Sequence, residues 1–198
     1  GSKKRMNTFE LYCRIGIEHI ADFKGYDHIL FILTLCGVYV IKEWKSILIL
    51  ITAFTIGHSI SLALAVLGFV AISAESIEFF IPVTIVITSV GNLFKKPGSI
   101  SPLLQTVKYV LALFFGLIHG FGFSNYLKAL LEKTELVLPL LSFNIGIELG
   151  QLIIVTSILT IATLVTRVGK VAQRDWNLVI SGAGLGVSLI MSVERFPW

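Results

Sequence analysis

Charged residues are scarce in this chain of 198 residues. Asp, Glu, Lys and Arg make up 14% of it, against about a quarter in typical soluble domains, and hydrophobic residues make up 55%. The mean hydropathy is +0.88. This composition excludes an ordinary water-soluble domain. The net charge of +4 is scattered between apolar segments and forms no basic face, so the sequence does not indicate nucleic-acid binding.

Cysteine is also rare, since Cys13 and Cys36 are the only two. Two cysteines this far apart do not indicate a disulfide framework or a thiolate zinc cluster. The amino-terminal segment contains no typical signal peptide, because charged residues interrupt 6–24 throughout. We interpret residues 1–5 as a tag or a disordered basic start, and 6–198 as a single transmembrane metal-binding domain.

Long apolar segments fill most of the rest of the chain. A bilayer core of about 30 Å requires roughly 20 apolar residues per helix, and six segments approach or exceed that length. The sequence therefore predicts an all-α, polytopic membrane helix bundle with six transmembrane helices. An amphipathic segment at 8–23 predicts an additional N-terminal helix that lies on the interface or re-enters the membrane. The six predicted spans are 27–44, 46–70, 76–94, 103–121, 136–166 and 176–194.

Basic residues follow the first, third and fifth predicted spans. The positive-inside rule assigns such loops to the cytoplasm, which leaves the N-terminus outside. We predict an integral protein of the bacterial inner membrane, surrounded by lipid and of undetermined oligomeric state. The residues on which this orientation depends are Lys42, Lys45, Lys95, Lys96, Arg167, Lys170 and Arg174.

Ionisable residues within the predicted spans are the first candidates for a functional site, because they are costly in lipid and usually face the bundle interior. Five of them lie 13 to 19 residues from the presumed cytoplasmic end of their helix. At 1.5 Å per residue this corresponds to heights of about 20 to 28 Å, although the helices run in alternating directions. The spacing thus predicts one polar layer in the outer half of the membrane, formed by His28, His58, Glu78, His119 and Glu148.

Imidazole and carboxylate groups together favour a divalent transition metal, with zinc or nickel as the expected ion. The predicted metal ligands are His19, Asp27, His28, His58, His119 and Glu148. The predicted supporting residues are Ser59, Glu78, Asn144 and Gln151.

Three of these residues also have simpler interpretations. Asp27 precedes an apolar run and could be only a helix N-cap, and adjacent side chains such as those of Asp27 and His28 do not easily face one ion. His19 could be an ordinary interfacial histidine, or a ligand that folds over the site. Glu78 could simply be a carboxylate that interacts favourably with the N-terminal end of its helix dipole. However, Pro82 removes the backbone hydrogen bond to the Glu78 carbonyl, which interrupts the helix at this point.

At these residues the sequence resembles the HupE/UreJ family of small membrane proteins, commonly described as nickel or cobalt permeases. The resemblance extends over most of the chain, and it implicates His19, Asp27, His28, His58, His119 and Glu148. One departure is Ile20, where the family often has a proline. The segments that carry the resemblance are 16–28 (GIEHIADFKGYDH), 54–59 (FTIGHS), 115–123 (FGLIHGFGF) and 143–151 (FNIGIELGQ), with a weaker one at Ile77, Glu78 and Asn92.

Two functions fit these features. One is a permease for nickel, cobalt or zinc with its site in the outer half of the bilayer. The alternative is a zinc-dependent intramembrane hydrolase of a lipid or lipid-linked substrate, in which Glu148 or Glu78 would be the general base. A third possibility is a metal that only braces the helices. The inner halves of the spans are mostly apolar and do not indicate a transport path, and the small polar residues Asn177, Ser181, Gly184 and Ser188 are interpreted as helix packing.

Overall fold

The computed structural model describes residues 7–23, 25–94, 102–130 and 136–197, and in these residues it is entirely helical. The predicted start at 1–5 and the basic residues Lys95 and Lys96 lie outside this part of the chain. The helices are α1 (Thr8–Ile20), α2 (Asp27–Cys36), α3 (Trp44–Val66), α4 (Ala74–Leu93), α5 (Pro102–Leu130), α6 (Val137–Thr163) and α7 (Gln173–Glu194). A 3-10 turn (Ile41–Glu43) leads into α3, and a π-helical turn (Leu164–Val168) follows α6.

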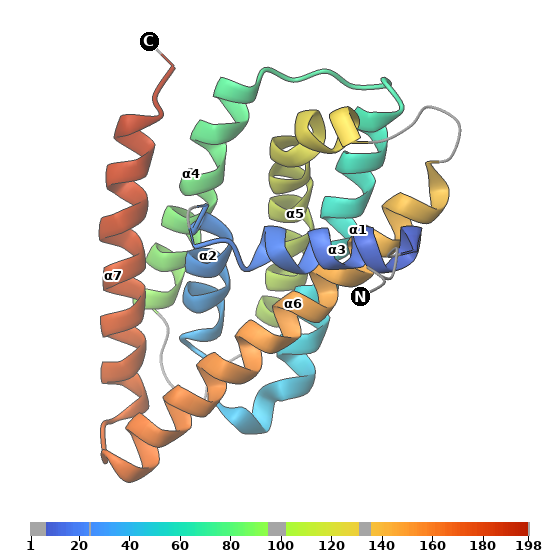
Figure 1. The fold of residues 1–198 in the computed structure, drawn as a ribbon. Coiled ribbons are helices and arrows are strands. Elements are labelled where there is room, and N and C mark those ends of the chain that lie inside the picture. The colour runs from blue at the N-terminus through green and yellow to red at the C-terminus, as the bar shows by residue number, and fades with distance from the viewer. Residues whose placement is uncertain (1–6, 24, 95–101, 131–135, 198) are drawn as a thin grey trace.

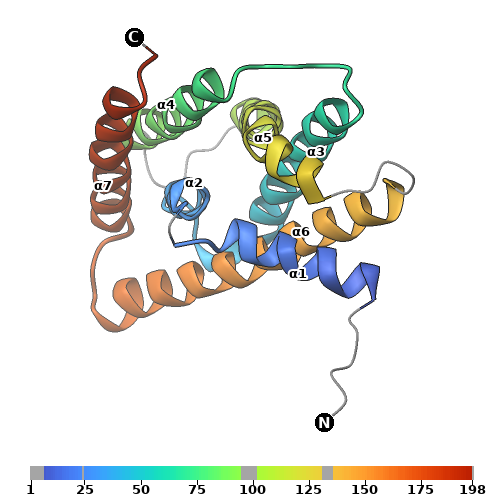
Figure 2. The same cartoon turned by 45° about the horizontal axis from the view of Figure 1, so that its top comes forward.

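The long helices α3, α4, α5 and α7 run up and down the bundle, whereas α6 crosses it at a slant (Figure 1). The predicted N-terminal helix is present as α1, which begins with a capping box between Asn7 and Glu10. It lies across the bundle against α6, and the short helix α2 follows it inside the ring formed by the longer helices (Figure 2). The start of α3, the end of α6 and the start of α7 share one end of the bundle, as the predicted spans require.

Five helices in the described residues are long and apolar enough to span a membrane, so the protein is a membrane protein. They correspond to the second to sixth predicted spans. The first predicted span, 27–44, is not observed as one helix, because α2 ends at Cys36 after ten residues. The apolar run continues through Tyr39, but hydropathy measures how apolar a segment is and does not reveal where its helix ends.

The early end of α2 leaves carbonyl groups that need hydrogen-bond donors inside the bundle. Other helices supply them. Asn92 Nδ2 donates to the carbonyl of Thr34 at 2.8 Å, and Gln173 Nε2 donates to that of Tyr39 at 3.2 Å. A helix half as long as a membrane span is therefore stable here, because side chains of α4 and α7 donate hydrogen bonds to carbonyl groups at and just after its C-terminal end.

Glycines allow two helix pairs to pack with their backbones in contact. A Cβ atom on Gly57 of α3 would collide with the carbonyl of Leu113, and one on Gly116 of α5 would collide with that of Phe54. The same reciprocal arrangement joins Gly16 of α1 and Gly146 of α6. Three of these glycines lie within three residues of a histidine in sequence, so the two contacts fix the heights of His19, His58 and His119.

Candidate metal centre

Four histidines from four helices come together in the bundle: His19 of α1, His28 of α2, His58 of α3 and His119 of α5. We call them the histidine cluster. The ring centroids of His19 and His28 are 4.7 Å apart, those of His28 and His119 are 5.0 Å apart, and those of His19 and His58 are 5.8 Å apart. One ring nitrogen from each of His19, His28 and His58 lies within 4.8 Å of the others. His119 completes the cluster beside His28.

Most of the ring nitrogens in the cluster lack a hydrogen-bond partner among the described residues. These atoms are His19 Nε2, His28 Nε2, His119 Nδ1 and both nitrogens of His58, and all are shielded from solvent. An unpartnered buried polar atom costs about 1 to 3 kcal/mol. Several of them converging on one point indicate a group that accepts several nitrogen lone pairs at once, which is the chemistry of a metal cation.

Asp27 orients His28. Its Oδ1 lies 3.2 Å from His28 Nδ1 and also accepts the backbone N–H of His28 at 3.0 Å. Its other oxygen, Oδ2, lies 3.2 Å from Nη1 of Arg195, which is just beyond α7. A carboxylate on one ring nitrogen fixes the tautomer, so that the lone pair of Nε2 points to the cluster. Asp27 is not the N-cap that the simpler interpretation made it, because Tyr26 occupies that position and Asp27 is the first residue of α2. Its carboxylate instead joins His28 to Arg195.

Thr84 of α4 sets the tautomer of His119 in a similar way. The Thr84 hydroxyl donates to the carbonyl of Ile81 at 2.7 Å and lies 3.2 Å from His119 Nε2. Since the hydroxyl proton is already used, His119 Nε2–H must be the donor to Thr84. The unpartnered Nδ1 of His119 therefore carries the lone pair.

His19 lies on α1, which is not one of the candidate membrane spans. Burial lowers the pKa of its imidazole well below the usual value, and neighbouring His28 and His58 lower it further. A neutral imidazole is the form that coordinates a metal.

A cavity of about 350 Å³ leads to the cluster. Asp22 and Glu78 line it together with His19, His28 and His119. Glu78 therefore faces the approach to the cluster, although no ring contact or hydrogen bond joins it to the histidines among the described contacts. Acidic side chains along this approach attract cations.

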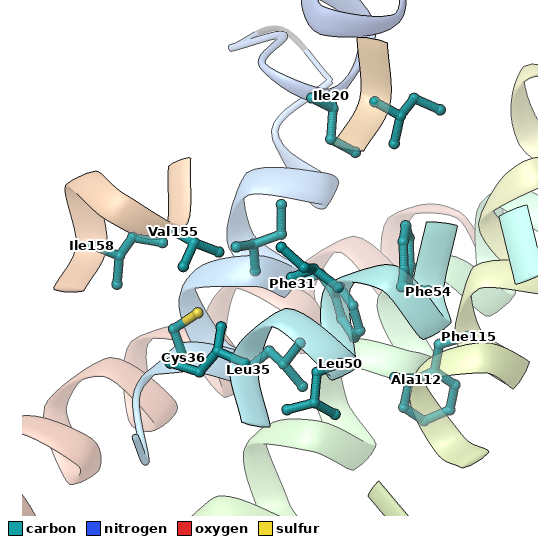
Figure 3. Packing of buried hydrophobic residues seen from close by; sticks show 14 of the residues in the cluster. Ile20, Phe31, Leu35, Cys36, Leu50, Phe54, Ala112, Phe115, Val155 and Ile158 are labelled. Atoms are coloured by element: carbon teal, nitrogen blue, oxygen red, sulfur yellow. The ribbon is translucent and has the colours of Figure 1, made fainter. Parts of the chain in front are cut away.

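Aromatic rings enclose the other sides of the cluster. Phe123 lies against His19, with centroids 3.9 Å apart, and stacks on Phe143. Phe31 and Phe54 each lie within 5.4 Å of the His119 ring. Figure 3 shows Phe31, Phe54 and Phe115 close together where α2, α3 and α5 meet. These rings exclude water and strengthen the interaction of the imidazoles with a charge.

Glu148 is not part of the group of close ligand atoms. Its Oε1 accepts a hydrogen bond of 2.7 Å from Thr52 of α3, six residues before His58, and its Oε2 has no partner among the described residues. Six helical residues correspond to about 9 Å, which explains the separation. The counting of heights was too coarse to resolve it.

The other predicted supporting residues make local contacts. Ser59 donates to the carbonyl of Thr55 in its own helix, and Asn144 donates to that of Leu140. Gln151 accepts from Thr55 at 2.8 Å and so ties α6 to α3. Sequence reasoning missed Arg195 and Thr84. Arg195 could have been suspected as a charge at the C-terminal end of the last span, whereas nothing in the sequence distinguishes Thr84 from other threonines.

Comparison with known proteins identifies the family. Residues 2–195 match the family model for HupE/UreJ proteins, which is nearly the whole chain. The chain belongs to the HupE/UreJ family. The match confirms the resemblance to this family, and its range includes every member of the histidine cluster. Neither the curated proteins nor the solved structures provide a match to this HupE/UreJ chain.

Proposed function

We propose that this protein is a permease for a divalent transition metal, with nickel, cobalt or zinc as its cargo, and that the histidine cluster is the binding site. The observation that carries this proposal is the convergence of unpartnered imidazole nitrogens on one point. The HupE/UreJ family, described as nickel or cobalt permeases, supports transport. The family match lends no support to the hydrolase alternative.

The binding site would have to contract around the ion. Four nitrogens at 2.0 to 2.1 Å from a tetrahedral metal lie about 3.3 Å from one another, whereas those of His19, His28 and His58 are now up to 4.8 Å apart. The ligands come from four different helices, so metal binding would draw these helices together. Such coupling between ligand and helix position is what a transport cycle requires.

The cavity gives the direction of entry. Its lining residues Glu78 and Arg195 lie near the start of α4 and just after α7, at the end of the bundle opposite Lys42, Lys45 and Arg167, which the positive-inside rule assigns to the cytoplasm. In that orientation the ion enters from outside, passes Glu78 and Asp22, and reaches the histidines.

Metal flux through the purified protein tests this function. The full chain in proteoliposomes should accumulate nickel, cobalt or zinc around a trapped indicator, at a rate that saturates with metal concentration. Protein-free liposomes provide the baseline. A protein that binds the metal stoichiometrically but moves none of the three ions would rule out the permease.

Replacing Asp27 with Ala should weaken metal binding by about 10- to 100-fold, the usual cost of losing a carboxylate behind a histidine ligand. The reason is that His28 loses the partner that fixes its tautomer. Calorimetric titration of the purified protein measures the effect. Glu18→Ala is the matched control, because Glu18 lies in the same segment, 16–28, but pairs with Arg14 on the surface. Equal affinities in the two variants would contradict the role of Asp27.

A further inference from the structure

We propose that the metal leaves the histidine cluster toward the opposite end of the bundle along a buried polar seam between α2, α4 and α7. This inference rests on the proposed permease function and adds the route to it. The polar seam consists of Thr34 of α2, Thr84, Ser89 and Asn92 of α4, and Asn177, Ser181, Gly184 and Ser188 of α7. The α7 residues had been interpreted from the sequence as helix packing alone.

The seam begins at the cluster. Thr84 contacts His119 directly, and Ser89 and Asn92 follow it on α4 within about 12 Å of helix. Thr34 lies six residues after His28 on α2. Every polar member of the seam is almost completely buried, with exposed fractions of 0 to 6%. Buried hydroxyl and amide groups therefore extend along α2, α4 and α7 from the level of the binding site into a part of the bundle where the sequence suggested mostly apolar residues.

Ser89 marks the centre of the seam. Its side chain is 0% exposed, and its hydroxyl has no hydrogen-bond partner among the described residues. A Cβ on Gly184 would lie 3.2 Å from Ser89 Oγ and would also crowd Thr34 Oγ1. The three helices thus meet with a free hydroxyl at their contact. Simple packing would be served better by alanine here, because an unpartnered buried hydroxyl is costly.

The seam continues to the far ends of α4 and α7. Asn92, in the last turn of α4, donates to the carbonyl of Thr34, and Asn177, in the first turn of α7, donates to the carbonyl of Asn92 at 2.9 Å. Ser181 donates to Asn177 Oδ1 at 3.0 Å. These residues surround the C-terminal end of the half-length helix α2. The negative end of a helix dipole stabilises a cation, and interrupted helices serve this purpose in transporters.

The oxygen atoms along the seam are suited to weak, transient binding of a metal ion rather than to tight binding. Hydroxyl and amide oxygens bind transition metals more weakly than imidazole nitrogens do. An ion can leave a strong site only through positions that compensate for its lost ligands without trapping it. The Asn177 to Asn92 hydrogen bond and the contact at Gly184 close the seam in this structure. It must open when α7 moves away from α2.

Ser89→Ala tests the route in the reconstituted full chain. We expect metal uptake to fall by roughly tenfold, since the ion loses an oxygen ligand where α2, α4 and α7 meet. Metal affinity of the histidine cluster and the unfolding temperature should not fall, because the change removes only an unpartnered hydroxyl. Ser157→Ala is the matched control: Ser157 is exposed on α6 and bonds its own helix. It should leave the uptake rate unchanged.

The outcomes separate the two proposals. Normal uptake by Ser89→Ala, with uptake by the unmodified protein established, would overturn the polar seam and leave the permease intact. Absence of uptake by the unmodified protein would overturn both.

Thiol labelling gives an independent readout of the seam. In a background with Cys13 and Cys36 replaced by Ala, Ser181→Cys should react with a small charged thiol reagent during transport, from the side opposite the cavity. Val179→Cys, on the exposed face of the same helix, should not. An unreactive Ser181→Cys, in a variant that still transports, would count against the route.

Discussion

His58→Leu is expected to abolish stoichiometric metal binding. The affinity should fall by more than about 100-fold, which exceeds the usual effect of removing a residue that only supports a metal ligand. His58 is fully buried, and neither of its ring nitrogens has a partner among the described residues. No hydrogen bond in the part of the chain that the structure describes explains its presence among the other three histidines. Leu fills a similar volume and leaves no polar atom unpaired, so the fold should persist.

Stability measurements show whether the loss is specific. Without metal, His58→Leu should unfold at the same temperature as the unmodified protein or higher, because two unsatisfied nitrogens are removed. With metal at 100 times its Kd, the unmodified protein should gain about 2.7 kcal/mol and the variant nothing. Retained stoichiometric binding by a folded His58→Leu protein would contradict the assignment of the site.

Gly116→Ala should destabilise the protein by roughly 1 to 3 kcal/mol, although alanine is the better helix former. The added Cβ would collide with the backbone of Phe54, which cannot move aside as a side chain would. The helices α3 and α5 must then separate, and with them His58 and His119. We expect metal affinity to fall together with the unfolding temperature measured in detergent.

Gly91→Ala provides the matched comparison, because a Cβ at Gly91 of α4 meets no atom within 4 Å. There the better helix propensity should stabilise the protein by up to about 1 kcal/mol. The two substitutions are chemically identical and should have opposite effects. A Gly116→Ala variant as stable as Gly91→Ala would show that α3 and α5 do not depend on this close contact.

The sequence predicts the features that follow from periodicity and length. The apolar runs locate five of the helices, and counting along them shows that histidines on different helices reach a similar height. Small residues within apolar helices indicate close helix packing, and a Cβ on any of the glycines at 57, 116, 120, 146 and 150 would collide with a neighbouring helix. These properties are local to each helix and need no knowledge of tertiary contacts.

What the sequence does not show depends on contacts between distant segments. The end of α2 is stabilised by Asn92 and Gln173, which no local pattern connects to residue 34 or 39. Glu148 has the expected residue type at an approximate height, but the slant of α6 places it beside Thr52. The pairing of Asp27 with Arg195 joins residues 168 positions apart. Side-chain direction and helix tilt decide all three.

Locating the bound metal tests the central claim most directly. Crystals of the protein loaded with nickel, cobalt or zinc would give anomalous difference maps at the absorption edge of the metal. We expect one ion within the histidine cluster, about 2.1 Å from Nε2 of His28, with Asp27 behind that ring. An ion bound at Glu148, or no ion among His19, His28, His58 and His119, would contradict it.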